Sequence, residues 1–100
     1  MNLSEAQVMI RKHMDENGLR QWKIKFTEAR GYAAECWHHK REFWFSKIHT
    51  MNASPEELRE TILHEIGHAI VGPIREKHGP VWAAAVRSIG GTPQRTTKMA

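Results

Sequence analysis

Polar and hydrophobic residues follow a helical spacing over the first part of the chain. Residues 4–17 carry an apolar stripe that is less regular than in an ideal amphipathic helix. Ser4 and Gln7 have the spacing of a capping box, and Asn17-Gly18 is a typical helix stop. The pattern therefore predicts a helix over 4–17. The stripe consists of Ala6, Val8, Met9, Ile10 and Met14.

An alternation of period two replaces the helical spacing in the next part of the chain. Apolar and polar residues alternate over 22–27, which predicts a half-buried strand. Residues 32–37 form a second candidate strand, although two alanines weaken its β propensity, and the aromatic-rich residues 42–48 form a third. A polar turn over 38–41 separates the last two. These short connections favour an antiparallel meander or a mixed sheet.

The clearest helix signal in the chain begins at Ser54. Pro55 suits the first helical position, and Glu57 completes a capping box with Ser54. The apolar positions that follow are so numerous that the helix should be largely buried, and Gly72-Pro73 should end it. The apolar stripe consists of Leu58, Ile62, Leu63, Ile66, Ala69, Ile70 and Val71.

A shorter helix is expected near the end of the chain. Pro80 opens it, residues 81–88 form it, and Gly90-Gly91 closes it. A helix, three short strands and two further helices indicate an α+β fold class. The residues from 92 to 100 are polar, and we expect them to form a disordered tail.

Composition limits the chain to one small domain, which we place at residues 1–91. The chain has 100 residues, of which 40% are hydrophobic and 26% are charged, as in folded domains. Its single cysteine excludes an intramolecular disulfide and a four-cysteine zinc site, and it favours a reducing compartment. The chain contains no apolar run long enough to span a membrane, and its first residues do not resemble a secretion signal. We expect a cytoplasmic monomer without a membrane partner.

The long buried helix contains the sequence His64-Glu65-Ile66-Gly67-His68, which is an H-E-x-x-H motif. Residues four positions apart lie on one helix face, with Cβ atoms about 5–6 Å apart. Both imidazoles can therefore bind one tetrahedral Zn²⁺ ion. Glu65 stands beside the first ligand, where it can take the proton of a zinc-activated water as that water attacks a carbonyl. The motif predicts zinc as the cofactor, His64 and His68 as ligands, and Glu65 as the catalytic residue.

A catalytic zinc ion usually has three protein ligands and a water, so a third ligand is required. Downstream of His68, Glu76 and His78 are the only possible ligands. Glu76 lies just past the Gly72-Pro73 break, so its side chain can reach the first two ligands only with difficulty. His78 directly precedes the next helix, and its side chain can turn towards the motif. We therefore expect His78 to be the third ligand. The alternatives are a structural zinc ion, which usually has four protein ligands, and a motif that binds no metal.

Several other residues have two possible roles. Gly67 lowers the stability of the helix relative to alanine. It either allows the sheet or the third-ligand segment to approach the helix closely, or it is tolerated because the helix is well packed. Trp82 is expected to pack in the core and hold the third-ligand segment, with substrate contact as the alternative. Cys36 is expected to be a small buried residue and not a nucleophile. Four histidines are expected to be exposed polar residues, with auxiliary metal ligation as the alternative for the last three: His13, His38, His39 and His49.

Three segments together resemble the SprT-like, or Spartan-type, zinc metalloprotease domain. They are Thr61–Ala69, His78–Trp82 and Ile89–Gly91, and the resemblance extends over residues 3–91. It implies a compact zincin-like fold, in which the N-terminal helix packs on a three-stranded sheet and a short helix follows the third ligand. Upstream landmarks of the family are also present, namely Trp22, Gly31-Tyr32 and the strand from Phe43 to Ser46.

The resemblance carries His64, His68 and His78 over as zinc ligands and Glu65 as the general base and acid of peptide hydrolysis. It implies a protein substrate, which an edge strand would align by strand addition. The best-known members cleave proteins bound or crosslinked to DNA. Many continue into a cysteine-rich zinc ribbon, which a chain with one cysteine lacks. This short form is typical of bacterial and phage genomes, which would place it in the cytoplasm or at the nucleoid.

A second hypothesis is a DNA-associated, zinc-containing binding module with weak or no proteolytic activity. The formal net charge is +4, and cationic residues crowd the sheet region together with aromatic ones. Such a surface can bind single-stranded DNA through phosphate contacts and base stacking. In the competing interpretation, the aromatic residues fill the core and the cations are merely solvated. A zinc amidase that acts on a non-peptide or cell-wall bond is a third hypothesis, and the absence of a secretion signal counts against it. The residues concerned are Lys23, Lys25, Arg30, Lys40, Arg41 and Lys47, with Trp37, Phe43 and Trp44.

Overall fold

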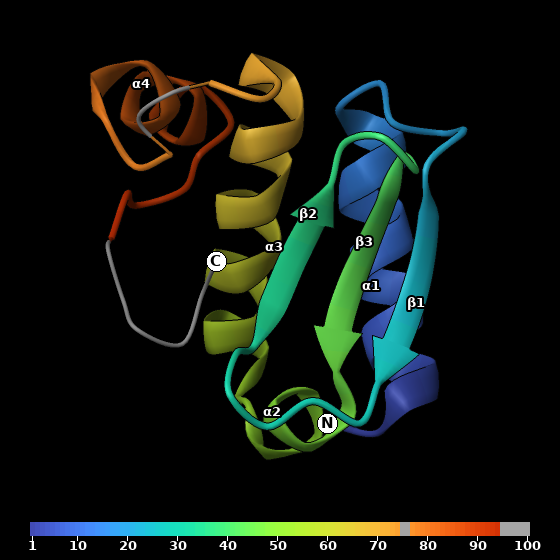
Figure 1. The fold of residues 1–100 in the computed structure, drawn as a ribbon. Helices are drawn as coiled ribbons and strands as arrows, with labels where there is room; N and C mark the ends of the chain where they lie inside the picture. Colours follow the sequence, from blue (N-terminus) through green and yellow to red (C-terminus); the bar gives the residue numbers. More distant parts are fainter. Residues whose placement is uncertain (75–76, 95–100) are drawn as a thin grey trace.

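The computed structural model describes residues 1–74 and 77–94, and within them four helices pack with one three-stranded sheet (Figure 1). The α+β fold class expected from the sequence is therefore confirmed. Residues 95–100, most of the expected tail, lie outside the described residues. The elements are α1 (Leu3–Glu16), β1 (Lys23–Thr27), β2 (Ala34–Trp37), β3 (Glu42–Ser46), α2 (Lys47–Asn52), α3 (Pro55–Val71) and α4 (Pro80–Ser88).

The sheet is mixed and has the strand order β1-β3-β2. β1 runs parallel to β3, with Lys23 opposite Glu42, and β2 runs antiparallel to β3, with Ala34 opposite Phe45. Of the two topologies that the sequence left open, the mixed sheet is therefore confirmed. In this order β2 is an edge strand, and it is the strand that packs against α3.

The core lies between one face of the sheet and the helices α1 and α3 (Figure 1). Because side chains alternate along a strand, one face of all three strands carries the apolar residues. The opposite face carries Lys23, Lys25, Trp37, Glu42 and Trp44. The buried residues of the core are Ala6, Ile10, Met14, Leu19, Ala34, Phe43, Phe45, Leu58, Ile62 and Ile66.

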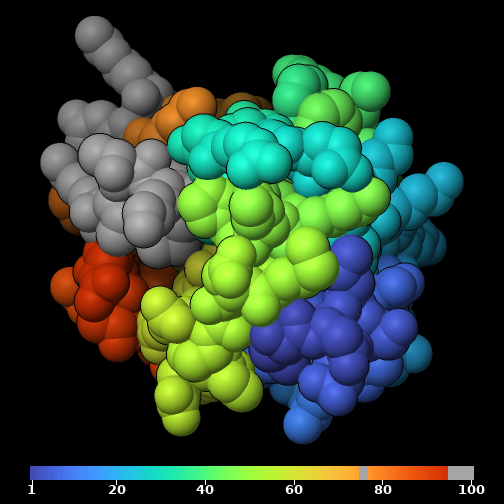
Figure 2. Space-filling view, turned by 90° about the horizontal axis from the view of Figure 1, so that it is seen from below, coloured from blue at the N-terminus to red at the C-terminus, as the bar shows by residue number. Residues whose placement is uncertain are grey.

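The predicted third strand is wrong beyond Ser46, because the chain turns there into the short helix α2. The Ser46 hydroxyl donates to the Ala29 carbonyl at 2.6 Å and accepts from the His49 amide at 3.3 Å. It therefore caps α2 and ties it to the loop after β1. The helix lies beside the N-terminal end of α1, where the Met1 ammonium donates to the Met51 carbonyl at 3.1 Å (Figure 2).

The predicted capping box at Ser4 is also wrong, since Asn2 caps α1 by accepting from the Glu5 amide at 2.8 Å. The box at the start of α3 is confirmed. The Ser54 hydroxyl accepts from the Glu57 amide at 3.1 Å, and the Glu57 carboxylate accepts from the Ser54 amide at 2.9 Å. These bonds fix where α3 begins and therefore which of its residues face the sheet.

Replacement of Ser54 by alanine removes one half of this box. Because an N-cap hydroxyl contributes about 1 kcal/mol, Ser54→Ala should lower the free energy of unfolding by about that amount. Ser4→Ala is the matched control: Ser4 is exposed inside α1, and its replacement should change stability by less than about 0.5 kcal/mol. Urea denaturation followed by circular dichroism measures both values, and equal losses would contradict the assigned caps.

Candidate metal centre

Three histidine side chains meet at one point between α3 and the turn that precedes α4. The Nε2 atoms of His64 and His68 are 3.3 Å apart, and each lies 3.2 Å from the Nε2 atom of His78. A tetrahedral zinc ion with Zn–N bonds of 2.0–2.1 Å would separate its nitrogen ligands by about 3.3–3.4 Å. The three nitrogens therefore have the spacing that a single ion requires. Among the described residues, this is the group identified as able to hold a metal ion.

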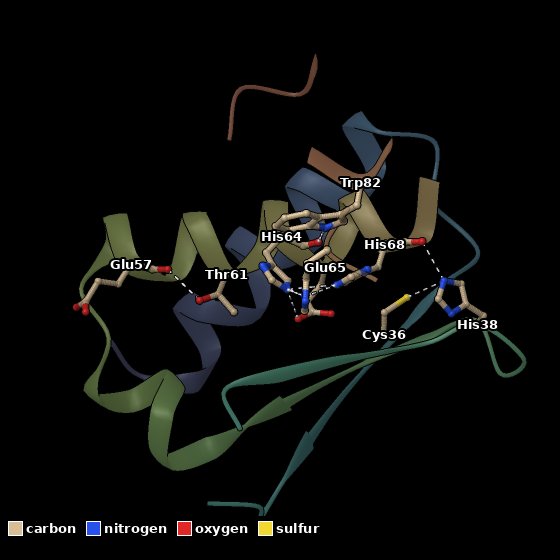
Figure 3. Close-up of polar contacts among 9 residues, drawn as sticks. Cys36, His38, Glu57, Thr61, His64, Glu65, His68 and Trp82 are labelled. Carbon is tan, nitrogen blue, oxygen red and sulfur yellow. Dashed lines mark hydrogen bonds and ion pairs between the residues drawn. The ribbon is translucent and has the colours of Figure 1, made fainter. Parts of the chain in front are cut away.

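The position of the motif on α3 explains how the chain forms this cluster. Figure 3 shows His64, His68 and the Glu65 carboxylate on the side of α3 that faces the sheet. His64 and His68 are buried, and burial, together with the neighbouring His64 and His78 imidazoles, lowers the pKa of His68 to about 3. The His68 ring is therefore neutral at pH 7, the form that binds metals. The other candidate for the third ligand, Glu76, lies outside the described residues.

Trp82 holds the three imidazoles from the α4 side. Its ring centroid lies 4.8 Å from those of His64 and His78 and 5.5 Å from that of His68. Its Nε1 donates to the His64 carbonyl at 3.1 Å, and only 1% of its surface is exposed. The prediction that Trp82 packs in the core and holds the third-ligand segment is confirmed.

Gly67 has the close-approach role that the sequence left open. A Cβ atom at this position would lie 2.6 Å from the Val86 Cγ2 atom and 3.1 Å from the Trp82 Nε1 atom. Carbon atoms do not approach to 2.6 Å without displacement, so only glycine lets α4 pack this closely on α3. This packing brings the turn that carries His78 to the motif.

Glu65 is the buried carboxylate of the site. It has no exposed surface, and neither carboxylate oxygen has a hydrogen-bond partner among the residues that the structure describes. Its Oε2 atom lies 3.8 Å from the His64 Nε2 atom. Burial raises its pKa well above the usual range, the Glu35 carboxylate raises it further, and the Lys77 ammonium opposes this. A buried carboxylate that lacks a partner beside three converging nitrogens fits a site that receives a cation and its water.

His38 does not follow its prediction as an exposed turn residue. It is half-buried, and its Nε2 donates to the His68 carbonyl at 2.9 Å and lies 3.7 Å from the Cys36 Sγ atom. The sequence missed this because the turn from β2 to β3 meets the last turn of α3 only in the folded chain. Burial, with a smaller contribution from the Glu65 carboxylate, raises the pKa of the Cys36 thiol to about 12, so the thiol stays protonated and is a poor nucleophile.

The other histidines lie away from the cluster. His39 is exposed, as predicted. His49 is half-buried in α2, where its Nε2 donates to the Arg30 carbonyl at 2.8 Å, so its prediction as an exposed polar residue is wrong. His13 is half-buried as well, although it was expected to be exposed on its helix. None of these three belongs to the metal-binding group found among the described residues.

Two cavities lie on opposite sides of the cluster along β2 and α3. The larger, of about 480 Å³, is lined by Ala33, Leu58 and Thr61 together with residues of α2. The smaller, of about 160 Å³, lies at the other end of β2 and includes His68 and Lys77 in its wall. Figure 3 shows Thr61, His64 and His68 in this order along α3. Thr61 lines the larger cavity and His68 lines the smaller one, so the cluster lies between them along the helix.

The assignment of His78 is tested by metal content. His78→Ala should bind much less than one equivalent of zinc after dialysis against a weak chelator, because two imidazoles hold the ion poorly. His39→Ala is the matched control and should retain the zinc content of the original protein, since His39 is exposed on a turn. Elemental analysis measures zinc per chain. Unchanged stoichiometry in His78→Ala would overturn the assignment.

Comparison with known proteins agrees with this geometry. A family model described as the SprT-like family matches residues 4–99. No curated protein and no solved structure matches the chain. Within residues 1–74 and 77–94, no helix is both long and apolar enough to cross a membrane. On the extent of the family match, the chain belongs to the SprT-like family.

Proposed function

We propose that this protein is a zinc-dependent metalloendopeptidase with a zincin-like active site. His64, His68 and His78 hold the zinc ion, and Glu65 is the general base and acid. The observation that carries the proposal is the convergence of three Nε2 atoms beside a buried carboxylate that has no hydrogen-bond partner among the described residues. Membership of the SprT-like family supports a metallopeptidase-type domain. A structural zinc ion would usually have a fourth protein ligand.

Glu65 performs the proton transfers in this proposal. Zinc, when bound, supplies Lewis-acid polarisation of the carbonyl and lowers the pKa of water. Glu65 accepts a proton from the attacking water and later donates it to the nitrogen of the leaving amine. Burial supports this role, because it raises the pKa of Glu65 and so raises its affinity for a proton near neutral pH.

The edge strand β2 supports the proposal that the substrate is a protein segment in extended conformation. The Ser46 amide donates to the Ala33 carbonyl at 2.8 Å, so these two residues form a hydrogen-bonded pair. The alternation of an antiparallel ladder then directs the amide and carbonyl groups of Ala34 and Cys36 away from β3. A peptide can pair with this edge by strand addition. A cavity lies on each side of the metal centre, so the substrate can extend in both directions from the scissile bond. This favours cleavage within a protein and not only at its ends.

One substitution separates catalysis from metal binding. Glu65→Gln should retain stoichiometric zinc and lower the rate of cleavage of an unfolded, fluorescently labelled casein by about 10²–10⁴-fold. Glu16→Gln, at an exposed position of α1, is the control and should keep full activity. Equal cleavage by Glu65→Gln and the original protein would refute the peptidase proposal, as would the absence of cleavage by the original zinc-loaded protein.

The outer face of the sheet supports a second candidate function, which is binding of single-stranded DNA. The Trp37 and Trp44 rings stack with centroids 4.2 Å apart. The Lys25 and Lys40 ammonium groups lie 5.7 and 5.6 Å from the Trp44 ring centroid. Phe43, by contrast, is buried in the core. The exposed Trp37 ring and the half-buried Trp44 ring can stack on bases, and the surrounding cations can contact phosphates. The ion pair between Lys25 and Glu42 at 3.6 Å offsets part of the charge.

Salt dependence tests the second candidate. If Lys23, Lys25 and Lys40 contact three phosphates, the binding constant for a single-stranded oligonucleotide should fall as the salt concentration rises. A plot of log K against the logarithm of the salt concentration should have a slope of about −2. Trp37→Ala should weaken binding by about 1–3 kcal/mol through lost stacking. Lys12→Ala, on exposed α1 surface, should have little effect. Fluorescence anisotropy gives these values, and a slope near zero would exclude a phosphate-binding face.

A further inference from the structure

Lys77 is a cation in the wall of the smaller cavity, beside the metal centre, and the proposed mechanism has not used it so far. Lys77 lines this cavity together with His68, and it directly precedes His78 in the chain. Its side chain has no ion pair or hydrogen bond with another residue in the described part of the chain. The remaining lining residues are Glu35, Cys36, His38, Gly72, Pro73 and Ile74.

Lys77 and the ligand His68 stand in the wall of the same cavity. Among the described residues that line this cavity, Lys77 is the only lysine or arginine. The other nearby donor, His38, already donates its Nε2 proton to the His68 carbonyl. Of the described lining residues, Lys77 is therefore the cation that is available to a substrate.

Peptide hydrolysis generates a negative charge that the protein must stabilise. As the water oxygen bonds to the carbonyl carbon, the π electron pair moves to the carbonyl oxygen and Glu65 takes the proton. When the C–N bond breaks, the carbonyl re-forms and the proton passes from Glu65 to the amine nitrogen. A fixed cation beside the developing oxyanion lowers the barrier, because it interacts more strongly with the transition state than with the neutral carbonyl.

We propose that Lys77 is a catalytic residue whose ammonium group binds the oxyanion formed on the scissile carbonyl. The proposal rests on the proposed peptidase function and adds a role that no histidine of the cluster performs. In this proposal the carbonyl oxygen enters the cavity of about 160 Å³ whose wall includes His68 and Lys77, and it accepts a charge-assisted hydrogen bond from the ammonium. The competing role is attraction of an acidic substrate side chain, which would act equally on the ground state.

Kinetics of charge variants distinguish the two roles. Lys77→Met should lower kcat on a quenched fluorescent peptide by on the order of 10²-fold, with little change in KM and with zinc content and thermal stability unchanged. Lys77→Arg should restore most of the rate, because it keeps the positive charge. Lys12→Met, which removes an equally exposed lysine from α1, should behave as the original protein.

A binding measurement provides a readout besides activity. A phosphinic peptide imitates the tetrahedral intermediate, so Lys77→Met should weaken its binding, measured by calorimetry, by a factor similar to the loss of kcat. Normal kcat in Lys77→Met would overturn the proposal, and so would an increase in KM alone. Loss of zinc from Lys77→Met would also overturn it, since Lys77 would then only position His78. If the original protein cleaves nothing, the peptidase proposal itself fails, and phosphinic peptide binding that is equal in both proteins still refutes the role of Lys77.

Discussion

Three imidazole nitrogens from two separate segments must meet within hydrogen-bond distance of one another. Two of them come from a single helix and follow from its geometry, but the third must arrive from a different segment with sub-ångström accuracy. The chain achieves this by packing α4 on α3 through Trp82 and Gly67, so that the turn before α4 stands directly over the motif. The formation of the candidate metal centre therefore depends on how α4 packs on α3.

The middle of α3 is costly for folding in the absence of a ligand. It buries two imidazoles and the Glu65 carboxylate, and burial of ionisable groups opposes folding unless they are neutralised, hydrogen-bonded or bound to a metal. The surrounding core of Ile62, Ile66 and Phe45 supplies apolar burial that offsets part of this cost. Metal binding would offset more of it, because a ligand that binds only the folded chain stabilises that chain.

Patterns among residues close in sequence predicted the bounds and the motif of α3 well. They did not predict which distant residues contact its histidines. The Ser54 capping box, the H-E-x-x-H spacing and the stop at Gly72 involve residues close in sequence, so their physics can be read from the sequence. Ser46 caps α2 while bonded to Ala29, and His38 reaches the carbonyl of His68; both contacts join residues that are distant in sequence. The cation at Lys77 was missed for the same reason, because only the fold brings it to the same cavity as His68.

The contact at Gly67 also affects how this sequence can change over time. Since the space beside its Cα atom is filled by the Val86 methyl group and the Trp82 indole, any larger residue at position 67 requires smaller ones across the helix interface. Positions 67, 82 and 86 should therefore vary as a set whose combined volume is conserved. A change in residue volume at one of these positions, without a compensating change at the others, would displace the turn that carries His78. The metal centre would then be lost although all three ligands are still present.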